Sequence, residues 1–131
     1  MKKLVLTFLL GTTMLAQVEK NYFRSPLDIP MQLSGNFGEL RPNHFHAGFD
    51  LKTNQREGLT VHAAADGYIS RIKISNFGYG KAIYITHPNG YTTVYGHLQR
   101  YQGKIQDKAI ELQYQAQDYE VEAFFKPGEI P

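Results

Sequence analysis

The chain has 131 residues, of which 42% are hydrophobic, enough for one packed domain and too few for two ordinary ones. Its 14 basic side chains outnumber its 12 acidic ones, but Lys2 and Lys3 carry the excess, so the rest of the chain is neutral and nothing indicates a nucleic-acid-binding surface. Cysteine is absent, which excludes disulfides, a lipoprotein anchor and a thiol nucleophile.

Residues 1–16 have the pattern of a secretory signal peptide. Lys2 and Lys3 form a positive start, residues 4–10 are apolar, and Ala16 ends the segment at a cleavage position. The apolar stretch is shorter than the roughly 20 residues that a membrane span needs, although an uncleaved anchor is the alternative. We therefore expect an exported protein in the periplasm or the extracellular cell envelope, without a stable membrane span.

The remainder has the patterns of a mainly β protein. Two prolines in residues 17–34 favour an extended lead-in, and residues 34–38 form a turn cluster. Alternating and β-branched runs predict strands over residues 59–64, 68–75, 81–87, 91–98 and 119–125.

The two central runs flank Pro88-Asn89-Gly90, which predicts a β-hairpin. Residues 106–117 are rich in Gln, Glu, Lys and Ala, and we expect them to form one short helix inserted after that hairpin.

The segment His46-Ala47-Gly48-Phe49-Asp50 carries the clearest chemistry. Imidazole and carboxylate groups are both good Zn²⁺ ligands. Residues four apart in a regular strand share a face but lie roughly 13 Å apart, so they reach one ion only if the backbone bends between them. Gly48 lies where that bend is needed. Taken alone, the pattern also fits a surface histidine followed by a turn aspartate.

Several further motifs follow this segment in a fixed order. They are Gly58-Leu59-Thr60-Val61, Ala63-Ala64-Ala65-Asp66-Gly67, Tyr79-Gly80, His87-Pro88-Asn89-Gly90-Tyr91 and Tyr95-Gly96-His97-Leu98. Together, over about residues 35–102, the succession resembles the lysostaphin/LytM-type zinc endopeptidases, metallopeptidase family 23. The resemblance implies an antiparallel sheet groove of the lysostaphin-like (duplicated hybrid motif) type, into which a peptidoglycan peptide is laid.

The resemblance also implies roles for individual residues. His46 and Asp50 match the family's first two zinc ligands, and His97 matches a catalytic histidine that helps to activate the attacking water. The family's third ligand belongs to a later His-x-His element, and no histidine follows His97 here. We therefore expect residues 35–131 to be the N-terminal part of such a domain, truncated before its C-terminal strands.

Other residues near these motifs have more than one interpretation each. His44 is a substitute ligand, a residue that supports the ligands without binding the metal, or a solvated residue at the rim of the site. Arg41 contacts a substrate carboxylate, supports the ligands without binding the metal, or is an ordinary surface residue. Tyr95 contacts the site or packs in the core. We expect His62 to be a partly exposed strand residue and His87 to be a structural residue at the hairpin turn.

The function expected from the resemblance is zinc-dependent hydrolysis of peptide bonds in peptidoglycan. The alternative is a non-catalytic peptidoglycan-binding or amidase-regulating module with a degenerate metal site. A third class comes from the motifs at residues 58–69, which look like hairpins of lipoyl-type and sugar-phosphotransferase carrier domains. Those carriers work in the cytoplasm, so the export sequence argues against them.

Overall fold

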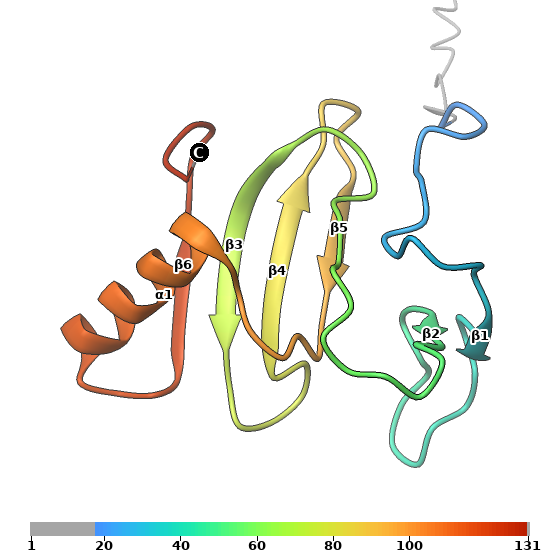
Figure 1. The fold of residues 1–131 in the computed structure, drawn as a ribbon, viewed down its shortest axis with the longest axis horizontal. Coiled ribbons are helices and arrows are strands. Elements are labelled where there is room, and N and C mark those ends of the chain that lie inside the picture. Colours follow the sequence, from blue (N-terminus) through green and yellow to red (C-terminus); the bar gives the residue numbers. More distant parts are fainter. Residues whose placement is uncertain (1–17, 131) are drawn as a thin grey trace, which may run out of the picture.

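The computed structural model describes residues 18–130, so the predicted signal peptide lies outside the described residues. In this part the chain forms two antiparallel sheets and one helix (Figure 1). The elements are β1 (Leu33–Gly35), β2 (Asp50–Leu51), β3 (Tyr68–Ile74), β4 (Lys81–Thr86), β5 (Thr92–Tyr95), α1 (Gly103–Ala116) and β6 (Val121–Phe124). The expected mainly β architecture with a single short helix is confirmed. No helix in the described range is long and apolar enough to cross a membrane.

The larger sheet has the strand order β5-β4-β3-β6, and every pair is antiparallel. β3, β4 and β5 follow one another as a meander, whereas β6 returns after α1 to pair with the free side of β3. The predicted hairpin is confirmed, because Thr86 pairs with Thr92 and the backbone N–H of His87 donates to the carbonyl of Tyr91 at 2.9 Å. Asn89 and Gly90 lie in the connecting turn.

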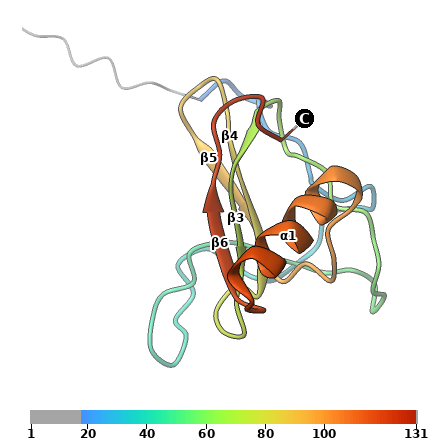
Figure 2. The ribbon, with the colours of Figure 1, turned by 90° about the vertical axis from the view of Figure 1, so that its left-hand side faces the viewer.

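Helix α1 packs against the β6 end of this sheet (Figure 2). The core between them contains Ile72 and Ile74 of β3, Ala109 of α1, Tyr101 and Ile130, all buried. The hydroxyl proton of Tyr101 is shared between the carbonyl oxygens of Lys73 and Ala82, at 3.1 and 3.0 Å. Burial raises the pKa of Tyr101 to about 12, so this phenol stays neutral. Its hydroxyl connects β3 and β4.

The prediction of a strand over residues 59–64 is wrong. This segment forms only isolated backbone hydrogen bonds with the lead-in, from His62 N to the carbonyl of Pro26 and from Arg24 N to the carbonyl of Ala64, both 2.8 Å. Proline has no N–H to donate, so Pro26 and Pro30 prevent this pairing from growing into a regular ladder.

Helix α1 begins three residues before the predicted start at 106. Gln106 lies within its first turns, where its side-chain amide oxygen accepts a hydrogen bond from the backbone N–H of Tyr101 at 3.2 Å. The side chain therefore satisfies a donor just outside the helix, a contact that composition alone does not reveal.

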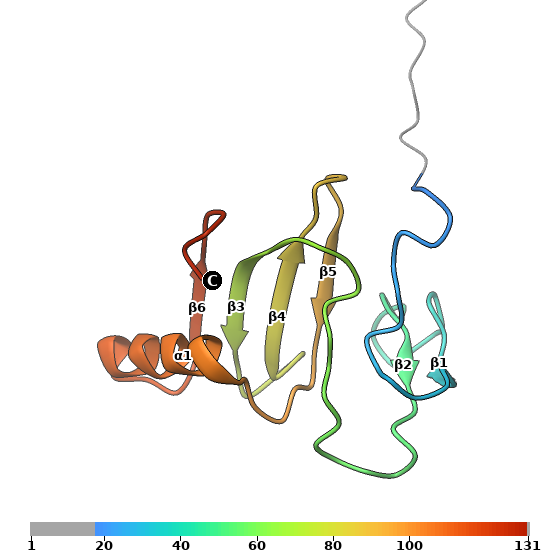
Figure 3. The same cartoon turned by 45° about the horizontal axis from the view of Figure 1, so that its top comes forward.

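The smaller sheet pairs β1 with β2, with Gly35 opposite Asp50. It lies on the β5 side of the molecule, on the opposite side from α1 (Figure 3). β1 begins at Leu33, inside the predicted lead-in, and Gly35 belongs to this strand and not to the predicted turn, which lies at residues 36–39. Residues 36–46 fold back as an irregular hairpin, in which Leu40 bridges to Phe45.

Candidate metal site

The structure brings His46 and Asp50 together. His46 ends the hairpin of residues 36–46, and Asp50 is the first residue of β2. The backbone bends at Gly48, and Nε2 of His46 lies 3.3 Å from Oδ1 of Asp50. The expected bend is therefore present, and it replaces the long separation of a regular strand with direct contact.

The imidazole of His46 is oriented by the backbone of the preceding turn. Its Nδ1 lies 3.0 Å from the carbonyl oxygen of Asn36. A carbonyl only accepts hydrogen bonds, so Nδ1 carries a proton in this contact, and Nε2 is the ring nitrogen that faces Asp50. A backbone carbonyl on the second ring nitrogen is the usual partner of a metal-binding histidine.

The carboxylate of Asp50 is held by Arg41. Nη2 of Arg41 donates to Oδ2 of Asp50 at 2.6 Å and lies 3.6 Å from Oε2 of Glu39. Asp50 thus uses one oxygen for the guanidinium and turns the other towards His46. Both carboxylates remain partly exposed, which leaves the site open to solvent.

A zinc ion fits this pair of atoms. Two ligands at about 2.0–2.1 Å from one tetrahedral zinc ion lie about 3.4 Å apart, close to the separation of Nε2 and Oδ1. Within residues 18–130, no group of three or more His, Cys, Asp or Glu side chains is arranged to hold a metal. The described residues therefore fit two positions of a zinc site and do not supply a third.

His97 lies after the end of β5 in a left-handed backbone conformation, with φ of 55°. Its N–H donates to the carbonyl of Tyr79 at 2.8 Å, and the two rings meet edge to face at 6.3 Å between centroids. Gly96 packs closely here, because a β-carbon would lie only 3.0 Å from the Tyr79 ring. The side chain of His97 is exposed, and it does not form a metal-holding group with His46 and Asp50 in the described chain.

The remaining candidates lie elsewhere. His44 is exposed in the bend of the 36–46 hairpin, where its carbonyl accepts from the N–H of Arg41 at 2.9 Å. Tyr95 is hydrogen-bonded to Ala64 and Thr93, away from His46. His87 is buried and hydrogen-bonded through both ring nitrogens, so it has the structural role expected for it.

His62 is half-buried, and its Nε2 donates to Asp28 at 2.7 Å. It lies in an irregular segment and not in the expected strand. Its ring therefore connects this segment to the lead-in.

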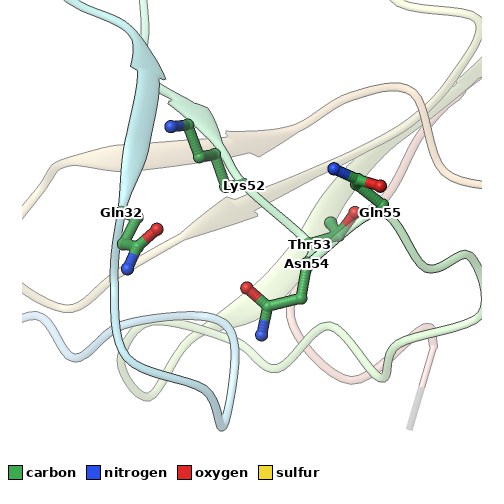
Figure 4. Close-up of a pocket in the computed structure, with 5 residues that line it drawn as sticks. All are labelled: Gln32, Lys52, Thr53, Asn54 and Gln55. Carbon is green, nitrogen blue, oxygen red and sulfur yellow. The ribbon is translucent and has the colours of Figure 1, made fainter.

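A separate polar cavity of about 500 Å³ lies beside the continuation of β2 (Figure 4). It is lined by Gln32, Lys52, Thr53, Asn54 and Gln55. None of the candidate residues lines it, so it is distinct from the His46–Asp50 site.

Sequence reasoning missed two contributors to the site, Gly35 and the backbone of Asn36. Both lie in the predicted turn, yet Gly35 is buried beneath the Asp50–Arg41 pair and Asn36 orients the ring of His46. The Gly-Asn dipeptide is typical of a turn, and no local pattern reveals that a distant carboxylate packs on it.

Comparison with known protein families identifies the family of this chain. The model of Peptidase family M23 matches residues 44–111, about half of the chain, and this range contains His46, Asp50 and His97. The chain belongs to this family.

The curated relatives that the chain matches are named as endopeptidases. The chain is 35% identical over 89 residues to the peptidoglycan DD-endopeptidase ShyC of Vibrio cholerae, covering 63% of this chain and 20% of the relative. It is 41% identical over 85 residues to the DD-carboxypeptidase/endopeptidase Mpg of Neisseria meningitidis, covering 61% and 19%. The chain thus spans about a fifth of the length of these relatives. No solved structure matches it significantly.

Proposed function

We propose that this chain contributes to an exported, zinc-dependent endopeptidase that hydrolyses peptide bonds of peptidoglycan. Membership of the peptidase family and the cell-wall relatives support the reaction and the substrate class. The observation that supports zinc binding is the 3.3 Å approach of His46 Nε2 to Asp50 Oδ1, with the opposite ring nitrogen hydrogen-bonded to the carbonyl of Asn36.

In this proposal His46 and Asp50 are two of the ligands, and water and groups beyond the described residues complete the coordination. Bound zinc supplies a Lewis acid that polarises the scissile carbonyl and makes a bound water more acidic. His97, with an exposed imidazole, accepts the proton of the attacking water and passes it to the leaving amine. Residues 35–131 are then one part of a lysostaphin-like domain, preceded by a lead-in and a signal peptide.

The first test is the zinc content of the purified chain after dialysis, measured by elemental analysis. With zinc supplied in the dialysis buffer, we expect weak binding of up to one zinc per chain, because the described residues offer only two ligands. Binding should be lost in His46→Ala and Asp50→Asn because each removes a ligand. The matched control is His44→Ala, which removes an exposed histidine two residues away and retains the metal.

Release of peptides from purified peptidoglycan by the mature protein, followed by mass spectrometry, then tests the reaction. Zinc-free wild-type protein that still binds peptidoglycan would identify the alternative, a non-catalytic binding or amidase-regulating module.

A further inference from the structure

The hairpin of residues 36–46 surrounds the two proposed ligands with a second layer of contacts. We propose that Arg41 is a positioning residue of the metal site, whose guanidinium holds Asp50 so that Oδ1 is aimed at Nε2 of His46. This inference rests on the proposed zinc site. It assigns Arg41 a role other than that of a substrate contact or an ordinary surface arginine.

The guanidinium is itself held in place by the hairpin. Oε2 of Glu39 accepts a hydrogen bond from the N–H of Asn36 at 3.0 Å and lies 3.6 Å from Nη2 of Arg41. The same Nη2 is 2.6 Å from Oδ2 of Asp50 and 3.4 Å from Nδ1 of His46. One nitrogen therefore bonds to Asp50 and lies beside the ring of His46, and a carboxylate anchored to the backbone fixes its position.

The backbone of β1 leaves room for this arrangement. Gly35 is buried opposite Asp50, and a β-carbon there would overlap the carboxylate of Asp50 and come within 2.5 Å of Nη2 of Arg41. The Asp50–Arg41 pair therefore lies directly on the glycine. Any larger residue at this position displaces the pair from its present geometry.

The charge of Arg41 and its positioning of Asp50 should affect metal binding in opposite directions. A positive guanidinium beside a cation site repels the cation, so its charge weakens metal binding. A positioning residue strengthens binding, because it holds the carboxylate in the ligating rotamer before the metal arrives. The sign of the change on removing Arg41 therefore separates the two effects.

The test compares Arg41→Met, which keeps the length of the side chain without a donor, with wild type in zinc calorimetry. We expect the affinity to fall by about 10- to 100-fold, the range found when groups that orient metal ligands are removed. Arg41→Lys, which retains one charged donor, should lose less. The matched control Arg56→Met removes an exposed arginine from another turn and should leave the affinity unchanged. Equal or tighter zinc binding by Arg41→Met would overturn the inference.

A second readout needs no metal. Side-chain coupling constants from NMR of the zinc-free protein report the χ1 rotamer of Asp50. We expect one χ1 rotamer of Asp50 in wild type and an average of several in Arg41→Met. The ¹⁵N shifts of His46 should report a proton on Nδ1 in both proteins. The same rotamer distribution in both proteins would refute positioning by Arg41. Failure of the wild type to bind zinc would instead count against the proposed function, and the rotamer measurement would still decide the role of Arg41.

Discussion

The hydroxyl group of Tyr95 joins the β4–β5 hairpin to the irregular segment before β3. It accepts a hydrogen bond from the N–H of Ala64 at 2.7 Å and is bonded to the hydroxyl of Thr93 at 2.8 Å. Thr93 in turn contacts Nε2 of His87, whose Nδ1 donates to the carbonyl of Asp66 at 2.7 Å. Since Ala64 and His87 are buried, these polar groups have no water to replace a lost partner.

Replacement of Tyr95 by Phe should therefore lower the free energy of unfolding by about 1–3 kcal/mol, because the N–H of Ala64 is left buried without an acceptor. Urea denaturation measures the change. Tyr84→Phe is the control, since within residues 18–130 the hydroxyl of Tyr84 has no hydrogen-bond partner and its ring packs under Arg71. We expect that variant to differ by less than about 0.5 kcal/mol. Equal losses in both variants would contradict a specific role for the hydroxyl of Tyr95.

The residue that follows helix α1, Gln117, has an unfavourable backbone conformation. Gln117 has φ of 53°, and its N–H and that of Asp118 return to the carbonyls of Tyr114 and Gln113. Glycine is the common residue at this left-handed position after a helix, because it has no β-carbon to collide with the backbone.

Substitution of Gln117 by Gly should raise the free energy of unfolding by about 0.5–1 kcal/mol, through relief of this conformational strain. The same substitution at Gln115, inside the last turn, should lower it by a similar amount because glycine disfavours the helix interior. Thermal unfolding of the two variants gives the signs. A destabilising effect at both positions would show that the side chain of Gln117, which donates to the carbonyl of Tyr114, outweighs the strain.

Elements defined by local pattern were predictable from the sequence, and elements defined by distant partners were not. β3, β4, β5 and the turn at Asn89-Gly90 follow from strand alternation and turn chemistry, and α1 follows from composition. The segment of residues 59–64 has strand-like composition. Its neighbour in space is the proline-containing lead-in, so the ladder does not form.

The same distinction holds for the candidate metal site. The approach of His46 to Asp50 follows from their spacing and Gly48. The contact of Arg41 with Asp50 depends on a hairpin that the sequence does not reveal. The left-handed conformation of His97 and the close packing of its neighbour Gly96 against Tyr79 are likewise not marked by any local pattern. The contact between the two candidate ligands was thus easier to predict than the layer of contacts that orients them.

The lead-in is attached to the rest of the molecule by side chains of several kinds. Leu27 is buried, and the ring of Phe23 meets that of His87 edge to face at 5.2 Å. Asp28 accepts from Nε2 of His62 and pairs with Arg24, both at 2.7 Å. The hydrogen bond from His62, helped by the charges of His62 and Arg24, lowers the pKa of Asp28 below its ordinary value of 3.8.

The lowered pKa of Asp28 predicts how acid reduces the stability of the fold. Because the folded protein holds Asp28 ionised to a lower pH than the unfolded chain does, the stabilisation is complete above pH 3.8 and disappears as the pH falls through the lower folded pKa. Thermal melts of wild type and Asp28→Asn between pH 6 and pH 2 should therefore converge at the acid end. His62→Gln removes the main cause of the lowered pKa of Asp28. In that background, replacing Asp28 by Asn should change the melting temperature less. Parallel melting curves across the whole range would rule out this contribution.

The order of strands in the larger sheet also affects how the chain assembles. Ile74 pairs with Lys81 of β4, seven residues away, but with Val121 of β6, 47 residues away. The entropy lost on closing a loop grows with its length, so the β3–β4–β5 meander has the lower barrier and the addition of β6 the higher one. The β3–β4–β5 part of the sheet should therefore form first and the β3–β6 pairing later. Helix α1 lies in the segment that this later pairing closes into a loop.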